Sequence, residues 1–167
     1  RLYRTDFLRS NGIDFPHHIK RFDDAPFQFL TFLAATQMVV VPEVYYNYRL
    51  GRPDQDVAVT DERLFIHFPI FDEMRTPVRN KGNYWVERQF KQLQINSHFW
   101  AMSILQPHLR ANYFKQIGPD IFNNCYFVSR LDILRFAYRM GSRKFRMVLK
   151  ALFIFLFSAP TTKGDKS

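Results

Sequence analysis

In the first sixty residues, apolar positions first recur with the period of a helix. The residues that follow have the composition of strands. A helix over residues 25–36 is predicted by the i, i+3, i+4 spacing of Phe29, Leu30, Leu33 and Ala34. Two adjacent carboxylates, Asp23 and Asp24, directly precede this pattern. A β-branched run predicts a strand over residues 38–41, and an aromatic segment predicts another over 44–50. A short helix over residues 5–10 should end at Asn11-Gly12, since glycine tolerates the left-handed conformation there.

From residue 60 to residue 159 the pattern is mainly helical. Thr60 is expected to cap a helix that Pro69 kinks or interrupts. Further helices are predicted over residues 83–106, 109–117, 128–140 and 143–157. Gly118-Pro119 is expected to break the second of these, with Asp120 capping the next. Residues 160–167 read as a disordered polar tail.

Composition and charge narrow the classes of protein. The single cysteine, Cys125, excludes an internal disulfide framework and favours a reducing compartment. A Cys/His cluster is absent from the sequence, so a structural zinc site is not expected. The net charge is +9, and residues 130–150 alone hold seven basic side chains against Asp132, which gives 7 − 1 = +6. This local excess indicates an anionic partner or surface.

An ordered set of short motifs in the first third of the chain carries a family resemblance. The set is Leu2-Tyr3-Arg4, Phe7-Leu8, Asn11-Gly12-Ile13, Phe15-Pro16, Asp23-Asp24, Tyr45-Tyr46-Asn47-Tyr48-Arg49 and Arg52. In this order it resembles the C-terminal portion of family 2 glycosyltransferases of the GT-A fold. The resemblance starts in mid-domain, so we interpret the chain as a fragment. Two departures are Asp23, where relatives carry Glu, and Asp54-Gln55, where they often carry Gly-Ser.

The resemblance implies a fold. We expect an α/β chain, with residues 1–59 as the C-terminal part of a GT-A (Rossmann-like) catalytic domain. Residues 60–159 would form a mainly helical C-terminal extension, followed by the tail at 160–167.

The resemblance also implies a chemistry, in which a sugar passes from a nucleotide-sugar donor to a saccharide or lipid-linked acceptor with inversion. Asp24 would be the base that takes the acceptor proton, with Asp23 as its acidic neighbour. Arg49 and Arg52 would bind the donor diphosphate, which the planar guanidinium suits. A divalent metal, Mn or Mg, would be held mainly by the preceding half of the enzyme. The fragment alone is therefore expected to be inactive.

Several other interpretations stay open. Asp23-Asp24 before a helix is also an ordinary N-cap. His17-His18 reads as an exposed loop pair rather than a metal site, and Trp85 and Trp100 as core anchors.

The competing class of function is a non-enzymatic, basic helical module that binds membrane or nucleic acid through residues 130–150. A known nucleic-acid motif is not found there, so we expect no nucleic acid. Residues 139–157 begin basic and end apolar, which is typical of a helix lying on an anionic membrane or of one packed on protein. We expect a cytoplasmic protein, peripheral at the inner face of the cell membrane, whose oligomeric state stays open.

Overall fold

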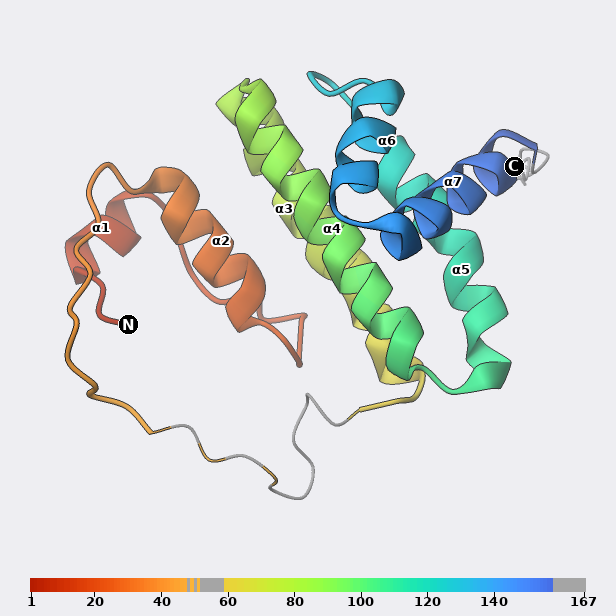
Figure 1. Ribbon diagram of the computed structural model, residues 1–167. Helices are drawn as coiled ribbons and strands as arrows, with labels where there is room; N and C mark the ends of the chain where they lie inside the picture. Colours follow the sequence, from red (N-terminus) through yellow and green to blue (C-terminus); the bar gives the residue numbers. More distant parts are fainter. Residues whose placement is uncertain (48, 50, 52–58, 158–167) are drawn as a thin grey trace, which may run out of the picture. The chain divides into compact units, whose positions relative to one another are not determined.

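The computed structural model describes residues 1–47, 49, 51 and 59–157, and all regular structure in these residues is helical (Figure 1). The chain folds as two compact units, Arg1–Lys81 and Gly82–Ser167. The first contains α1 (Thr5–Ser10), α2 (Asp24–Ala34), the 3₁₀ helix η2 (Glu62–Ile66) and α3 (His67–Lys81). The second contains α4 (Tyr84–Ile104), α5 (Pro107–Phe122), α6 (Arg130–Arg139) and α7 (Ser142–Phe157).

The expected α/β fold is wrong for the residues described. Residues 38–41, 44–47 and 49 form no strand, and residues 48 and 50 lie outside the described part of the chain. Val39 and Val40 are 88% and 89% exposed. β-branched residues favour a strand only where a neighbouring strand takes up their backbone hydrogen bonds, and the described residues supply none. Residues 1–47, 49, 51 and 59–157 therefore do not carry the sheet of a GT-A fold.

The first unit is organised by α1 and α2. As predicted, α1 ends at Asn11-Gly12: Gly12 has φ +61°, and the Ile13 amide donates to the Leu8 carbonyl at 2.9 Å. This bond and the left-handed Gly12 are the features of a Schellman motif, which satisfies a carbonyl that the helix itself leaves without a partner.

Aromatic packing fixes the start of α2. The Phe27 ring is 6% exposed, stacks on Phe15 at 4.2 Å and meets the edge of Tyr3 at 5.3 Å. At the other end of α2, Lys81 Nζ donates to the Leu33 carbonyl at 3.0 Å, which suits the negative end of the helix dipole. The first turn of α2 is thereby held in a fixed position within its unit.

The next helix begins one residue later than predicted. Asp61, rather than Thr60, caps η2 by accepting from the Arg63 amide at 3.1 Å. Hydrogen bonds from the Arg63 side chain lower the pKa of Asp61 to about 2. Pro69 interrupts nothing, because it is the third residue of α3, where a backbone N–H has no intrahelical partner. Both η2 and α3 belong to the first unit, which ends at Lys81.

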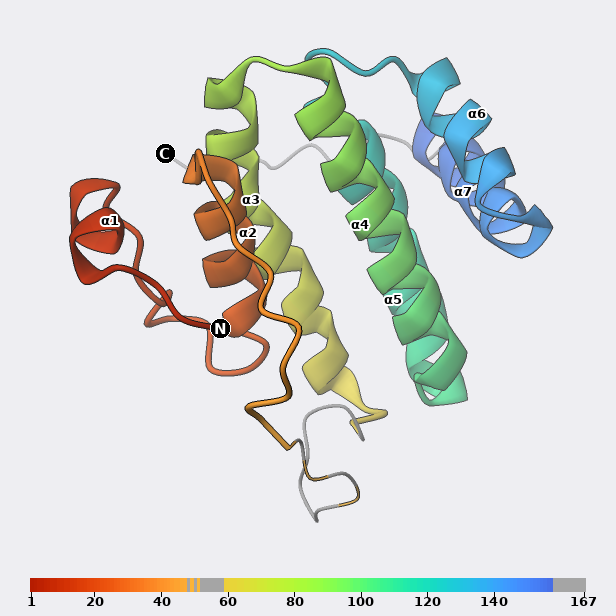
Figure 2. The ribbon, with the colours of Figure 1, turned by 60° about the vertical axis from the view of Figure 1, so that its left-hand side comes forward.

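The second unit is a four-helix arrangement built on α4. α4 and α5 lie side by side and run in opposite directions, and α7 packs on both α5 and α6 (Figure 2). Most of its buried side chains are apolar, and the most deeply buried of these include Ile95, Ala101, Ile117, Ile121, Ile133, Ala137 and Val148. The helices predicted over 83–106, 128–140 and 143–157 are confirmed to within two residues at each end.

The expected break at Gly118-Pro119 does not occur, since α5 continues to Phe122. Proline removes one hydrogen bond from a helix interior, but tertiary packing can outweigh that cost. Gly118 shows where the packing is closest: a Cβ added there would meet the Ala151 carbonyl oxygen at 2.7 Å and Phe155 Cβ at 2.9 Å. Glycine therefore lets α5 and α7 approach at this point.

Candidate functional site

The acidic pair lies where the sequence predicts it, at the start of a helix. Asp23 occupies the N-cap position of α2 and Asp24 is its first residue. The Asp23 side chain makes no capping hydrogen bond, so the interpretation as an ordinary N-cap lacks its usual contact. Asp24 is exposed, and its Oδ2 accepts from Gln28 Nε2 at 3.2 Å. The pair thus presents two carboxylates at the positive end of the α2 dipole.

The turn into this helix is strained. Phe22 has φ +54°, a conformation that a bulky residue rarely adopts, and its carbonyl accepts from the Ala25 amide at 3.1 Å. Such strain persists only where the surroundings fix it, and it occurs preferentially at functional sites. The observation marks this helix start as a candidate site rather than an ordinary turn.

The two arginines predicted to bind the donor diphosphate are Arg49 and Arg52. Arg49 is exposed, outside α2, on the segment without regular structure that follows it. Arg52 lies outside the described residues. The two aspartates lie together at the start of α2. Binding of the donor diphosphate by Arg49 and Arg52 stays a prediction.

A metal site does not form within the part of the chain that the structure describes, where no three His, Cys, Asp or Glu side chains gather. His18 instead pairs with Glu73 on α3, with Nε2 and Oε1 2.7 Å apart. The expected divalent cation, held mainly by the preceding half of the enzyme, therefore stays a prediction.

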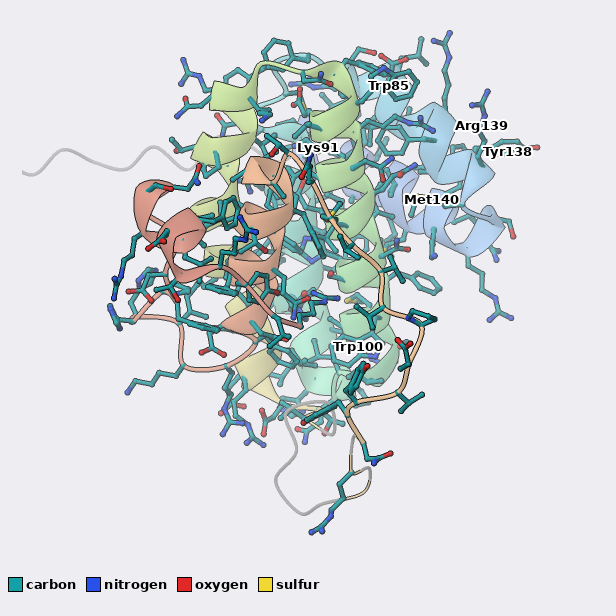
Figure 3. The ribbon with its side chains drawn as sticks, turned by 90° about the vertical axis from the view of Figure 1, so that its left-hand side faces the viewer. Trp85, Lys91, Trp100, Tyr138, Arg139 and Met140 are labelled. Carbon is teal, nitrogen blue, oxygen red and sulfur yellow. The ribbon has the colours of Figure 1, made fainter. Side chains whose placement is uncertain are left out.

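A hollow in the second unit gathers basic and aromatic side chains. It is lined by Tyr84, Trp85, Arg88, Asp132, Arg135, Phe136 and Arg139. Trp85 is 61% exposed, so it is not the core anchor expected from the sequence, and the Arg88 guanidinium lies 5.3 Å from the centre of its ring. Figure 3 shows Trp85 near one end of α4, with Tyr138 and Arg139 projecting from α6. This surface can attract anions.

A row of buried polar side chains on α4 was missed by sequence reasoning. Glu87, Lys91, Gln94 and His98 are each at most 1% exposed and recur at i, i+4, i+7 and i+11, on one helix face. Lys91 Nζ, labelled in Figure 3, donates to the Ile121 carbonyl at 2.7 Å. Polar residues in a helix are usually assigned to its solvated face, so the only available signal was that their spacing matches the core period.

The inner end of this row is a buried hydrogen-bond network, in which Gln94 Oε1 is left without a partner among the described residues. His98 Nε2 is 2.7 Å from Asp120 Oδ2, and His98 Nδ1 is 3.0 Å from the Tyr113 hydroxyl. Gln94 Nε2 also donates to Asp120 Oδ2, at 2.8 Å. Burial, and secondarily the charge of Asp120, raises the pKa of Tyr113 far above its usual range. Asp120 was expected to cap a helix, but it lies inside α5 and joins α5 to α4. Because His98 is 0% exposed, a substrate cannot reach this network, and its role is structural.

No protein-family model, curated protein or solved structure matches this chain. These comparisons therefore show no family, and the resemblance to family 2 glycosyltransferases stays an expectation from the motifs in the sequence.

Proposed function

We propose that this chain is the acceptor-side part of an inverting glycosyltransferase related to family 2. It would serve transfer of a sugar from a nucleotide-sugar donor to a saccharide or lipid-linked acceptor. The observation that carries the proposal is the exposed Asp24 at the first turn of α2, within an ordered run of family-like motifs. The proposal does not depend on a GT-A sheet.

Asp24 is the base. The acceptor hydroxyl oxygen forms a bond to the anomeric carbon as the bond from that carbon to the diphosphate oxygen breaks, and Asp24 takes the hydroxyl proton. A base must be open to the acceptor and held still, and Asp24 is exposed on a helix start that Phe27 anchors through aromatic contacts. The partial positive charge of the helix N-terminus favours an anionic side chain there. Asp23, one residue earlier, orients the acceptor or Asp24.

The departing nucleoside diphosphate needs positive charge, which Arg49 and Arg52 would supply. Arg49 is exposed. A divalent cation, which in such enzymes neutralises the diphosphate, would have to be held by residues other than those described. We place the enzyme at the cytoplasmic face of the cell membrane, where nucleotide sugars are available.

The proposal is tested by measuring nucleoside diphosphate release from a panel of nucleotide sugars. The protein is produced from the complete reading frame that contains this chain, with Mn²⁺ or Mg²⁺ and with saccharide or lipid-linked acceptors. We expect acceptor-dependent release for one donor. Arg49→Gln should slow release by about a hundredfold, whereas Arg9→Gln, an exposed arginine on α1, should leave it unchanged. Failure of every donor and acceptor to react would contradict the proposal.

A further inference from the structure

We propose that the outer face of α7 binds the surface of an anionic lipid bilayer, with the helix lying in the interface. The outer face is defined by the exposed residues Arg143, Arg146, Leu149, Lys150, Phe153, Leu156 and Phe157. The proposal goes beyond transfer chemistry, because it concerns the other folding unit and a different ligand.

The opposite, inner face of α7 fixes the orientation of the helix. Val148 and Ala151 are 0% and 1% exposed, and the helix packs on α5 and α6. The close approach at Gly118 and the Arg130 guanidinium, 5.2 Å from the centre of the Phe155 ring, hold this face in place. The outer face therefore cannot turn inward to bury its own side chains.

The second half of the outer face is a stripe of large apolar side chains. Leu149 is 45% exposed, Phe153 62%, Leu156 52% and Phe157 73%. They follow the i, i+4, i+7, i+8 spacing of one helix side, and the rings of Phe153 and Phe157 are 4.6 Å apart. Scattered exposed apolar residues are normal in proteins, but a continuous stripe of them marks an interaction surface.

The first half of the same face is basic. Arg143 and Arg146 lie on it before the stripe, Lys150 lies on it directly after Leu149, and Arg139 is exposed at the end of α6. α7 contains no acidic residue. Asp132, the single acid of residues 130–150, is engaged by Ser129 and Arg135. The charge of this surface thus complements an anionic one.

A bilayer interface accounts for both halves of the face. Basic side chains contact anionic headgroups while Phe and Leu enter the acyl boundary. Nucleic acid would account for the arginines but not for the Leu149–Phe157 stripe. α7 has 16 residues, and none of the helices described is long and apolar enough to cross a membrane. The helix would therefore lie on the bilayer.

Vesicle sedimentation with the wild type and three variants tests the proposal. The apolar variant is Phe153→Ser with Phe157→Ser, the basic variant is Arg143→Gln with Arg146→Gln, and the matched control is Val39→Ser with Val40→Ser in the first unit. Vesicles are phosphatidylcholine alone or with about a third phosphatidylserine. Because all of these side chains are exposed, the variants should unfold at the same temperature as the wild type.

We expect the wild type to prefer the anionic vesicles. The apolar variant should bind them at least about tenfold more weakly, and the basic variant should lose the preference for anionic lipid. The control should behave as wild type. Absence of wild-type binding, equal binding by all forms, or binding to RNA in place of vesicles would overturn the proposal. Since no sugar transfer is measured, the result is independent of the proposed enzymatic function.

Discussion

Glu87 gives the sharpest test of how the second unit is stabilised, because its buried carboxylate accepts three hydrogen bonds from the connection between α5 and α6. Its Oε1 accepts from the Tyr126 amide at 3.0 Å, and its Oε2 accepts from the amides of Phe127 and Val128 at 2.5 and 3.0 Å. These three residues lead into α6, so Glu87 on α4 joins the α5–α6 connection to the bundle. A buried carboxylate is tolerated where it accepts several hydrogen bonds.

The cost of removing this carboxylate follows from the three bonds. A hydrogen bond to a charged group contributes about 1.5–3 kcal/mol to stability. The bonds from the Tyr126 and Phe127 amides are part-buried, whereas the bond from the Val128 amide is buried, so in a variant the Val128 amide is the one most completely cut off from water. We therefore expect Glu87→Ala to lower the free energy of unfolding by about 3–5 kcal/mol. Glu87→Gln keeps one acceptor oxygen but directs an NH₂ group at one of the amides. This variant should therefore lower the free energy of unfolding by about 2 kcal/mol.

The assay is urea unfolding followed by tryptophan fluorescence. Both tryptophans, Trp85 and Trp100, lie on α4, so the signal reports the second unit alone. The midpoint should fall in the order wild type, Gln, Ala with little change in slope. Gln89→Ala, an exposed change on the same helix, should stay within about 0.5 kcal/mol. A loss below about 1 kcal/mol for Glu87→Ala would refute the role given to the three hydrogen bonds.

Two further predictions concern the same unit. Gly118→Ala should destabilise it by about 1–2 kcal/mol, because the clash of the new Cβ with the Ala151 carbonyl outweighs the roughly 1 kcal/mol that alanine gains in a helix; a raised melting temperature would contradict the α5–α7 packing. Burial raises the pKa of the Cys125 thiol, so its alkylation by iodoacetamide should need a higher pH in the folded chain than in urea. Equal pH profiles in both conditions would show that the thiol is exposed.

The helices could be predicted from the sequence because their apolar residues repeat with a period near 3.6. The end of α1 follows from Gly12, and the start of α4 follows from Asn83, whose side chain caps that helix. The start of α2 at the acidic pair was predictable because the acidic pair directly precedes an apolar pattern of helical period. These signals are local, and local packing in each unit agrees with them.

The strands were mispredicted because a strand is not a local structure. Residues 38–41 have the composition of a strand, but composition supplies no partner for their backbone groups. The continuation of α5 through Pro119 was missed for a related reason, since its packing on α7 involves residues about thirty positions away. The polar row from Glu87 to His98 was missed because its partners lie on α5 and on the connection to α6.

The place of Asp24 could be predicted, but its chemistry depends on residues that local pattern cannot bring to it. Its position, exposure and contact with Gln28 are properties of one helix end. Which anion Arg49 would bind, and where that anion would sit, depends on contacts between distant parts of the chain.

The most direct test of the proposed function is the transfer rate of Asp24→Asn beside that of Asp6→Asn. Both aspartates are exposed in the first turn of a helix, so the two variants are matched. Asparagine caps a helix about as well as aspartate but cannot take a proton at this step. We predict that Asp24→Asn keeps the wild-type melting temperature and loses at least about a hundredfold in transfer, while Asp6→Asn keeps both. Wild-type transfer by Asp24→Asn would contradict its role as the base and leave Asp24 as an ordinary residue of a helix start.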